Sequence, residues 1–279
     1  MNRLIKKWII WWGSFSIALF PGFASAKAEE VSLEAYAAHF SLRLAGYGFL
    51  AIVGLLLIAT LLRKPNEQIK QLLFVSVASL TAAVTVVLVG TTLYLNTISW
   101  SNGPVHWHAD FEVWACGQEL DLLDPQGRFS NKTGTPTRHE HNDKRLHIEG
   151  VLVNEEDATL SSLFAALGGR LTGNELVFPT NDHLATYQTG GTCPDGLPGF
   201  VQVFAYQTSP DGYYQQRPVD PSLHQIAAQS QVPPGDCIIV EFGLLVTKTD
   251  RLCRSYVVAE EIGELKGLRS DRAVGPGEE

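Results

Sequence analysis

VHWHADFEVWA, residues 105–115, is the stretch from which the fold of this chain can be worked out. Apolar residues stand at the odd positions and, up to Glu112, polar residues stand at the even ones. This period of two residues is typical of a β-strand with one apolar and one polar face. The polar face would carry four side chains that can bind a metal ion: His106, His108, Asp110 and Glu112.

A second histidine-rich stretch, RHEHNDKRLHIEG at residues 138–150, shows the same parity. Leu146 and Ile148 fall on one side of the alternation, and the possible ligands fall on the other: His139, His141, Asp143, His147 and Glu149. The two stretches together hold five of the chain's eight histidines. If they lie close together in one sheet, all five imidazoles point to the same side of it.

Imidazole and carboxylate groups are the usual ligands of zinc, copper(II) and non-haem iron. We therefore expect three or four of the five histidines to bind one divalent metal ion, copper or zinc. Asp110, Glu112, Asp143 and Glu149 would be additional ligands or would orient the imidazoles. The alternative interpretation is that these histidines only cover the solvated face of a sheet. The only methionine is the initiator, which excludes a thioether site for copper(I).

The first 26 residues have the three parts of a secretory signal peptide. A basic start is followed by an apolar core at 8–20 and by the small-residue sequence Ala-Ser-Ala at 24–26. We expect cleavage after Ala26. An uncleaved signal anchor over 1–26 is the alternative.

Two longer runs, 44–62 and 72–95, are apolar and uncharged, and each is long enough to cross a bilayer as a helix. The loop between them, 63–71, carries three basic residues, and short loops rich in Lys and Arg stay in the cytoplasm. The segment 27–43 carries Glu29, Glu30 and Glu34 and is assigned to the extracytoplasmic side. These patterns predict a two-pass protein of the cell membrane whose C-terminal domain is periplasmic or extracellular.

From residue 98 onward the composition is that of a soluble domain, which we place at 98–265, before a disordered tail at 266–279. Acidic residues outnumber basic ones 25 to 13 between residue 98 and the end, which argues against nucleic acid as a partner. All four cysteines lie here, and an even number in an oxidising compartment suggests two disulfides. We favour Cys237–Cys253, because the segment after the last strand can run back alongside it. That choice leaves Cys116–Cys193.

The order of elements predicts the fold class. A strand at 105–116 and a shorter one at 118–123 would form a hairpin, a polar loop covers 124–138, and a strand follows at 146–153. A helix at 160–167 precedes strands at 175–178, 200–207 and 237–242, and residues 250–265 can form a last helix. A hairpin, a helix and further strands that end in an apolar one are the order of a β-grasp, or ubiquitin-like, domain. The expected class is therefore α+β.

The same motifs resemble a known family. VHWHADFEV at 105–113, HEHND at 139–143, HIEG at 147–150, LSSLFAALG at 160–168 and PGDCIIV at 234–240 are similar to membrane-anchored or secreted bacterial and archaeal proteins with an HxH…HxHD…xHxE pattern. The resemblance covers about 105–243 and implies a metal-binding domain. Asn142 stands where such proteins often carry Asp, with Asp143 next. A second similarity, of His106-x-His108-x3-Glu112 to the first cupin motif, offers a cupin-like β-barrel as the alternative fold.

Three classes of function are compatible with these patterns. The first is a metal-binding domain that senses, buffers or transfers copper or zinc outside the membrane. The second is a metal-dependent enzyme with a His/carboxylate site. The third is an interaction module of a membrane assembly, with other membrane or periplasmic proteins as partners. Serine-nucleophile, P-loop and dinucleotide motifs are absent from the sequence. We expect the first class.

Overall fold

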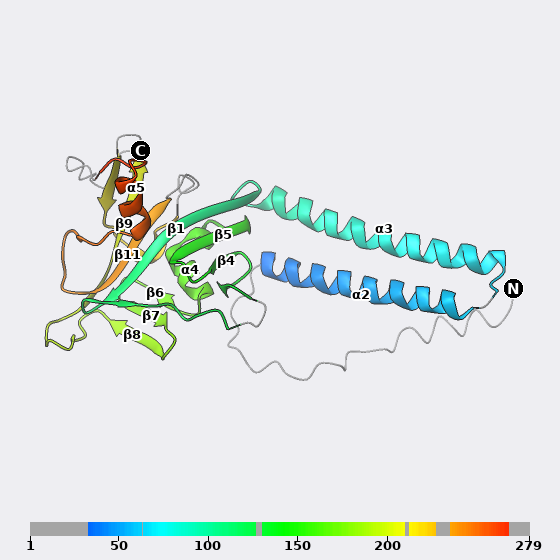
Figure 1. Ribbon diagram of the computed structural model, residues 1–279, viewed down its shortest axis with the longest axis horizontal. Coiled ribbons are helices and arrows are strands. Elements are labelled where there is room, and N and C mark those ends of the chain that lie inside the picture. Colours follow the sequence, from blue (N-terminus) through cyan, green and yellow to red (C-terminus); the bar gives the residue numbers. More distant parts are fainter. Residues whose placement is uncertain (1–32, 63, 127–129, 210–211, 227–234, 268–279) are drawn as a thin grey trace.

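Two long apolar helices precede a sheet domain. α2 (Leu33–Leu61) and α3 (Glu67–Ile98) run antiparallel beside each other, and α3 leads directly into the domain (Figure 1). The computed structural model describes residues 33–62, 64–126, 130–209, 212–226 and 235–267. The predicted signal peptide at 1–26, the start of the segment 27–43 and the tail beyond 267 lie outside the described residues.

Both helices are long and apolar enough to cross a membrane, over Tyr36–Leu61 and Glu67–Ile98. They extend beyond the predicted spans of 44–62 and 72–95. No proline or glycine interrupts residues 33–43, so α2 continues through them and includes Arg43. α3 begins after Asn66, whose side chain accepts a hydrogen bond of 2.9 Å from the backbone N–H of Ile69 and caps the helix.

The domain is built on one eight-stranded sheet with the order β10-β9-β11-β1-β5-β4-β3, and β2 pairs with β1 beyond the end of β5. The strands are β1 (Pro104–Ala115), β2 (Gln118–Leu120), β3 (Thr133–Gly134), β4 (Arg138–Glu140), β5 (Arg145–Val151), β9 (Phe200–Ser209), β10 (Gly212–Gln216) and β11 (Asp236–Gly243). β1 and β11 are parallel, and the other described neighbours are antiparallel. The described strands leave the sheet open at β10 and β3, so they close no cupin-like barrel.

The apolar face of the sheet packs against the main core. The odd-numbered residues of β1 from Trp107 to Ala115 are all buried there, as their alternation predicts. α4 (Leu160–Ala166) and a second sheet of β6 (Arg170–Leu171), β7 (Glu175–Pro179) and β8 (Leu184–Gln188) contribute the facing residues. Thr159 caps α4, and Leu163 and Phe164 are fully buried, which stabilises the fold by about 1.5–3 kcal/mol for each side chain.

The opposite face is divided into two halves. α5 (Arg254–Glu261) lies on the half formed by β9, β10 and β11, where the fully buried Tyr256 donates its hydroxyl to the carbonyl oxygens of Tyr206 and Gly235 at 3.0 and 2.7 Å. The half formed by β5, β4 and the first part of β1 carries the histidines.

Two disulfides link the domain, with the pairing that the sequence favours. Cys116 bonds to Cys193, with their Cα atoms 5.6 Å apart, and ties the end of β1 to the loop after β8. Cys237 bonds to Cys253, with a Cα separation of 5.7 Å, and ties the start of β11 to the start of α5.

Several predicted elements differ from the structure. The second strand stops at Leu120 instead of residue 123, because the backbone N–H of Leu123 donates to Pro179 in the second sheet. The expected loop 124–138 contains β3 and the first residue of β4. The last helix spans only Arg254–Glu261 of the expected 250–265. β8 and β10 were not expected, since neither 184–188 nor 212–216 has a clear alternation of apolar and polar residues.

Candidate metal centre

The histidines are brought together by the pairing of three adjacent strands. In the antiparallel register of β1 and β5, His108 lies opposite His147, and His106 lies opposite Glu149. In the register of β4 and β5, His139 lies opposite His147. Residues directly opposite on one face of a sheet are neighbours. His108, His147 and His139 therefore form a row across three strands, and His106 and Glu149 form part of the next row.

A glycine allows β4 to lie close to β3. Gly134 has a φ of +121°, and a Cβ atom at this position would be 2.5 Å from the carbonyl oxygen of Arg138. A larger residue would therefore push β3 away from β4. Arg138 anchors β4 on its other side through an ion pair of 2.6 Å with Asp157 in the 3-10 helix η2 (Glu155–Ala158). Between these contacts, the side chain of His139 is fully buried.

The five imidazoles converge, as the parity of the sequence predicts. Their ring centroids are 4.5 Å apart for His106 and His108, 4.6 Å for His108 and His147, 4.8 Å for His139 and His141, and 4.9 Å for His141 and His147. The rings of His139 and His147 stack in parallel at 5.3 Å.

The geometry divides these histidines into two groups that share one member. His106, His108 and His147 place one potential ligand atom each within 4.8 Å of one another, and so do His139, His141 and His147. We call them the outer triad and the inner triad, because His106 is exposed whereas His139 is buried. His147 belongs to both triads and lies between them.

Buried imidazole nitrogens without partners indicate what the cluster can do. Among the described residues, no ring nitrogen of His139 or of His147 makes a hydrogen bond of good geometry, although all four atoms are buried; His139 has only a weaker contact with the backbone of Thr135. A buried polar atom left unsatisfied costs about 1–3 kcal/mol, so four of them in one place need a compensating contact. A metal ion bound to imidazole nitrogens supplies one. The residues present therefore fit a metal ion.

His141 is already oriented for such a role. Its Nδ1 lies 3.0 Å from the carbonyl oxygen of Asn131, which can accept a hydrogen bond only from a protonated nitrogen. That bond fixes the tautomer with Nε2 unprotonated. Metal-binding histidines commonly use one nitrogen for the ion and donate the other N–H to a carbonyl in this way.

The electrostatic environment keeps three of the imidazoles neutral. Burial, followed by the neighbouring His108, His139 and His141, lowers the pKa of His147 to about 4. Burial also lowers the pKa of His139 and, together with the adjacent His106, that of His108. Neutral imidazole is the form that binds metal ions, so the site is prepared for a cation at neutral pH.

Of the four carboxylates that the sequence proposed as further ligands, only Glu149 lies among the histidines. Its Oε1 is 3.2 Å from Nε2 of His106 and 3.9 Å from Nδ1 of His147, and its Oε2 is 3.8 Å from Nε2 of His139. It therefore faces both triads.

The other three carboxylates have different partners. Asp110 forms a two-point ion pair with Arg145, at 2.6 and 3.1 Å. Glu112 accepts a hydrogen bond of 3.0 Å from Nε1 of Trp114. Asp143 accepts one of 3.1 Å from the backbone N–H of Arg145, in the turn between β4 and β5. The expectation that these three serve the metal site finds no support in their contacts.

A residue that the sequence analysis did not single out shapes the site. The buried carboxylate of Glu140 accepts backbone hydrogen bonds of 2.6–2.7 Å from Asn142, Asp143 and Lys144. It holds the tight turn that brings β4 back alongside β5, in which Asn142 and Lys144 adopt positive φ values of 64° and 61°. The Asn-Asp pair that follows HEH is a turn signal that points to this role.

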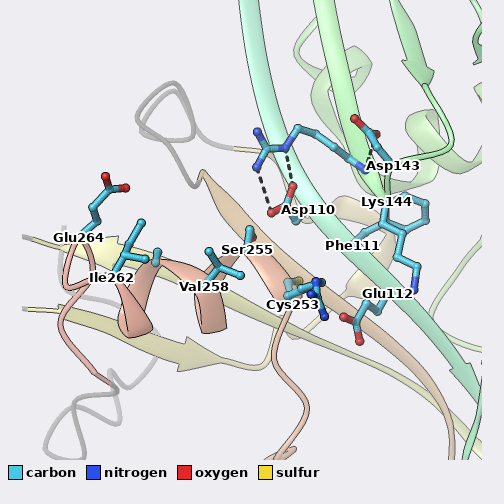
Figure 2. A pocket seen from close by; sticks show the side chains of 13 residues that line it. Asp110, Phe111, Glu112, Asp143, Lys144, Cys253, Ser255, Val258, Ile262 and Glu264 are labelled. Carbon is cyan, nitrogen blue, oxygen red and sulfur yellow. Dashed lines mark hydrogen bonds and ion pairs between the residues drawn. The ribbon is translucent and has the colours of Figure 1, made fainter.

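A pocket lies beside the cluster on the same face of the sheet. Its volume is about 520 Å³, and it lies between α5 and the strands β1 and β5. Figure 2 shows Asp110, which pairs with Arg145, at one side of this pocket, and Val258 of α5 and Ile262 directly after that helix at another. Asp110 and Arg145 face each other one row along from His108 and His147, so this ion pair separates the pocket from the histidines.

Comparisons of this chain with protein-family models, with curated proteins and with solved structures found no match. The resemblance noted from the histidine motifs therefore stays an expectation. What is known of this site comes from its own geometry.

Proposed function

We propose that this chain is a membrane-anchored, extracytoplasmic metal-binding protein whose histidine cluster holds a divalent copper or zinc ion. The observation that carries the proposal is the set of four buried imidazole nitrogens on His139 and His147 without hydrogen-bond partners among the described residues. A polar sheet face that merely meets solvent would not bury these atoms. A bound cation satisfies the unprotonated nitrogen of each ring without any other change in the fold.

The donor set favours a transition metal such as copper(II) or zinc over calcium and magnesium. Five imidazoles and one carboxylate surround the site, and imidazole suits zinc, copper, iron and nickel. Calcium and magnesium take oxygen ligands instead, and a single carboxylate offers too few. No cysteine thiol is free to join the site, since all four cysteines form disulfides.

The location outside the cytoplasm follows from two features. Disulfides form and persist in oxidising compartments, and both of them lie in the sheet domain. The loop between α2 and α3 is basic, which favours the cytoplasmic side for that end of the helical pair and the opposite side for the domain.

The fold is proposed to be a β-grasp domain enlarged by insertions. Neighbouring strands of its sheet follow the order β5-β1-β11-β9-β10. In this order β1 and β11, the first and last strands of the domain along the chain, lie side by side and parallel. α4 follows the antiparallel pair of β1 and β5 along the chain and packs on the apolar face of the sheet, as the helix of such a domain does. β3, β4 and the second sheet would be additions to this plan.

Metal analysis of the full-length protein in detergent tests the proposal. Protein depleted with a chelator and then dialysed against Zn²⁺ or Cu²⁺ should retain metal after desalting. The variant His147→Ala should lose most of it, because His147 belongs to both triads. His183→Ala is the matched control, since His183 is exposed and lies outside both triads. Equal metal content in wild type and His147→Ala would reject the proposed site.

A metal-dependent enzyme is the second candidate, and the neighbouring pocket favours it. A cavity of about 520 Å³ one row away from the histidines could hold a small substrate. Glu112 lines this cavity, and burial raises the pKa of its carboxyl group, as is common for general acids and bases. Water exchange at the bound metal, measured by NMR relaxation with Cu²⁺, separates the two: an exchanging water ligand favours the enzyme, and a closed coordination shell favours storage or transfer.

A further inference from the structure

We propose that the cluster holds two divalent cations, one at each His-x-His pair, and that the carboxylate of Glu149 bridges them. This inference rests on the proposed function and specifies it further: the sequence predicts a single ion, whereas the geometry provides two adjacent triads. The outer ion would be held by His106 and His108, and the inner ion by His139 and His141.

The first argument is that five imidazoles are too many for one ion. Zinc sites use four ligands, and copper(II) sites built from imidazole are similarly limited. The ring centroids are spaced evenly along a chain from His106 through His108, His147 and His141 to His139, with neighbouring rings 4.5–4.9 Å apart. The outer and inner triads each place three ligand atoms within 4.8 Å of one another, with only His147 in common.

The second argument is the position of Glu149. One carboxylate oxygen approaches the outer triad, 3.2 Å from Nε2 of His106, and the other approaches the inner triad, 3.8 Å from Nε2 of His139. A carboxylate with one oxygen toward each of two ligand groups is arranged to join two cations. Its negative charge also reduces the repulsion between them, which is strong for two divalent ions at short range.

The third argument is that His147 has two available nitrogens. Both Nδ1 and Nε2 are buried, and neither has a hydrogen-bond partner among the described residues. A histidine that binds one ion normally has its second nitrogen engaged by a carbonyl or a carboxylate, as His141 does. At His147 neither nitrogen has a hydrogen-bond partner among the described residues, and the residue lies between the two triads; loss of its ring proton would let it bind an ion on each side as an imidazolate.

The two positions differ in exposure to solvent, so the two ions should differ in how tightly they bind and how fast they exchange. The side chain of His106 is 61% exposed, whereas that of His139 is 0% exposed. The inner ion should therefore bind more tightly and exchange more slowly, because its ligands are already held in place and shielded from water. The outer ion should bind second and leave first. This order suits a protein that accepts a cation at its surface and keeps another beneath it.

The test is a titration of the chelator-treated full-length protein in detergent with Zn²⁺ alone. We expect two Zn²⁺ per chain in two distinguishable steps. His106→Ala with His108→Ala should remove the weaker step and leave one ion. His141→Ala should weaken the tighter step by at least about tenfold, because losing even a residue that only orients a ligand costs about that much. This single change is preferred for the inner position because His139 is fully buried and its replacement can disturb the fold.

The bridge itself is tested with Cu²⁺ and electron paramagnetic resonance. Two Cu²⁺ ions joined by Glu149 should show magnetic coupling, and Glu149→Gln should weaken that coupling and leave only the part that passes through His147. Glu156→Gln is the matched control, because Glu156 is exposed and lies outside the cluster. A coupling of unchanged strength in Glu149→Gln would overturn the bridge.

The outcomes separate the inference from the proposed function. No bound metal in the wild type would reject both. One ion per chain in the wild type would reject the two-ion site and leave the proposed metal-binding function intact. Two ions per chain, with one remaining when the outer histidines are replaced, would support the two-ion site.

Discussion

Asp110 and Arg145 form a two-point ion pair in the row next to His108 and His147, with Nε of Arg145 2.6 Å from Oδ1 of Asp110 and Nη2 3.1 Å from Oδ2. The pair takes up both oxygens of Asp110 and raises the pKa of the Arg145 guanidinium, chiefly through the hydrogen bond that Arg145 donates to Asp110. Asp110 was a candidate ligand by sequence parity, yet its contacts assign it to the structure of the sheet. Glu149, at the same parity on the neighbouring strand, remains directed at the histidines.

This difference predicts opposite effects for two conservative substitutions. Asp110→Asn should lower the free energy of unfolding by about 1–3 kcal/mol, because it weakens charged hydrogen bonds that are largely buried, and should leave the metal content unchanged. Glu149→Gln should weaken metal binding and leave the metal-free protein nearly as stable as the wild type. Thermal melting in the presence of a chelator and metal analysis measure the two effects separately. A loss of metal content in Asp110→Asn would show that the ion pair belongs to the site.

Removal of the metal should lower the melting temperature of the sheet domain. The inner triad joins β4 to β5, and the outer triad joins β1 to β5, so bound ions link three strands. A ligand that binds only the folded state stabilises it in proportion to the logarithm of its concentration over its dissociation constant. Melting curves with and without a chelator should differ in the wild type and coincide in His147→Ala. Coincident curves in the wild type would contradict a structural role for the ions.

The metal-free protein should lose stability as the pH falls from about 6.5 to about 4. The imidazole of His147 protonates near pH 6.5 in the unfolded chain, whereas burial lowers its pKa to about 4 in the folded state. Between these values the unfolded state binds more protons, so acid favours unfolding. His139 and His108, whose pKa values are also lowered, act in the same direction. Chelator-treated protein should therefore melt at a lower temperature at pH 5 than at pH 7, and the difference should shrink in His147→Gln.

The two disulfides should contribute unequally to stability. Cys116–Cys193 closes a segment with a sequence separation of 77, and Cys237–Cys253 one of 16. Loop-closure entropy then assigns about 4.5 kcal/mol to the first and about 3 kcal/mol to the second. Paired Cys→Ser variants, compared by chemical denaturation, should show the larger loss for the longer loop. Peptide mapping without reduction checks the pairing, and crossed peptides would contradict it.

The membrane topology can be tested with single cysteines. All four native cysteines form disulfides, so a new thiol is the only one available for labelling. Asn66 is a poor position because its side chain caps α3, whereas Gln68 is exposed in the same turn region and Asp182 is exposed in the sheet domain. In intact cells an impermeant reagent should label Asp182→Cys and leave Gln68→Cys unlabelled. The reverse pattern would place the domain in the cytoplasm.

The sequence by itself determined the faces of the central strands. The alternation of residues 105–115 fixes which side chains meet the core, because successive residues of a strand point to opposite sides. It also determined the two apolar helices, because their length and apolar composition can be recognised without knowing what they pack against. The helix at Leu160–Ala166 followed from its spacing of apolar residues, and the structure places its cap at Thr159.

Only the tertiary structure decided which strands are neighbours, and with them the composition of the site. The histidine-bearing half of β1 pairs with β5, and β5 pairs with β4 on its other side. β2 is nearer to β1 in the chain, yet it pairs only with the other half of β1. The alternation alone made four carboxylates equally good candidate ligands: Asp110, Glu112, Asp143 and Glu149. It specifies which face of the sheet a residue is on, but not which residue lies opposite it. The register placed His106 opposite Glu149 and Asp110 opposite Arg145. The carboxylate of Glu149 therefore faces the histidines, whereas that of Asp110 is paired with Arg145. Such charge pairing depends on distances between strands, and no local sequence pattern encodes these distances.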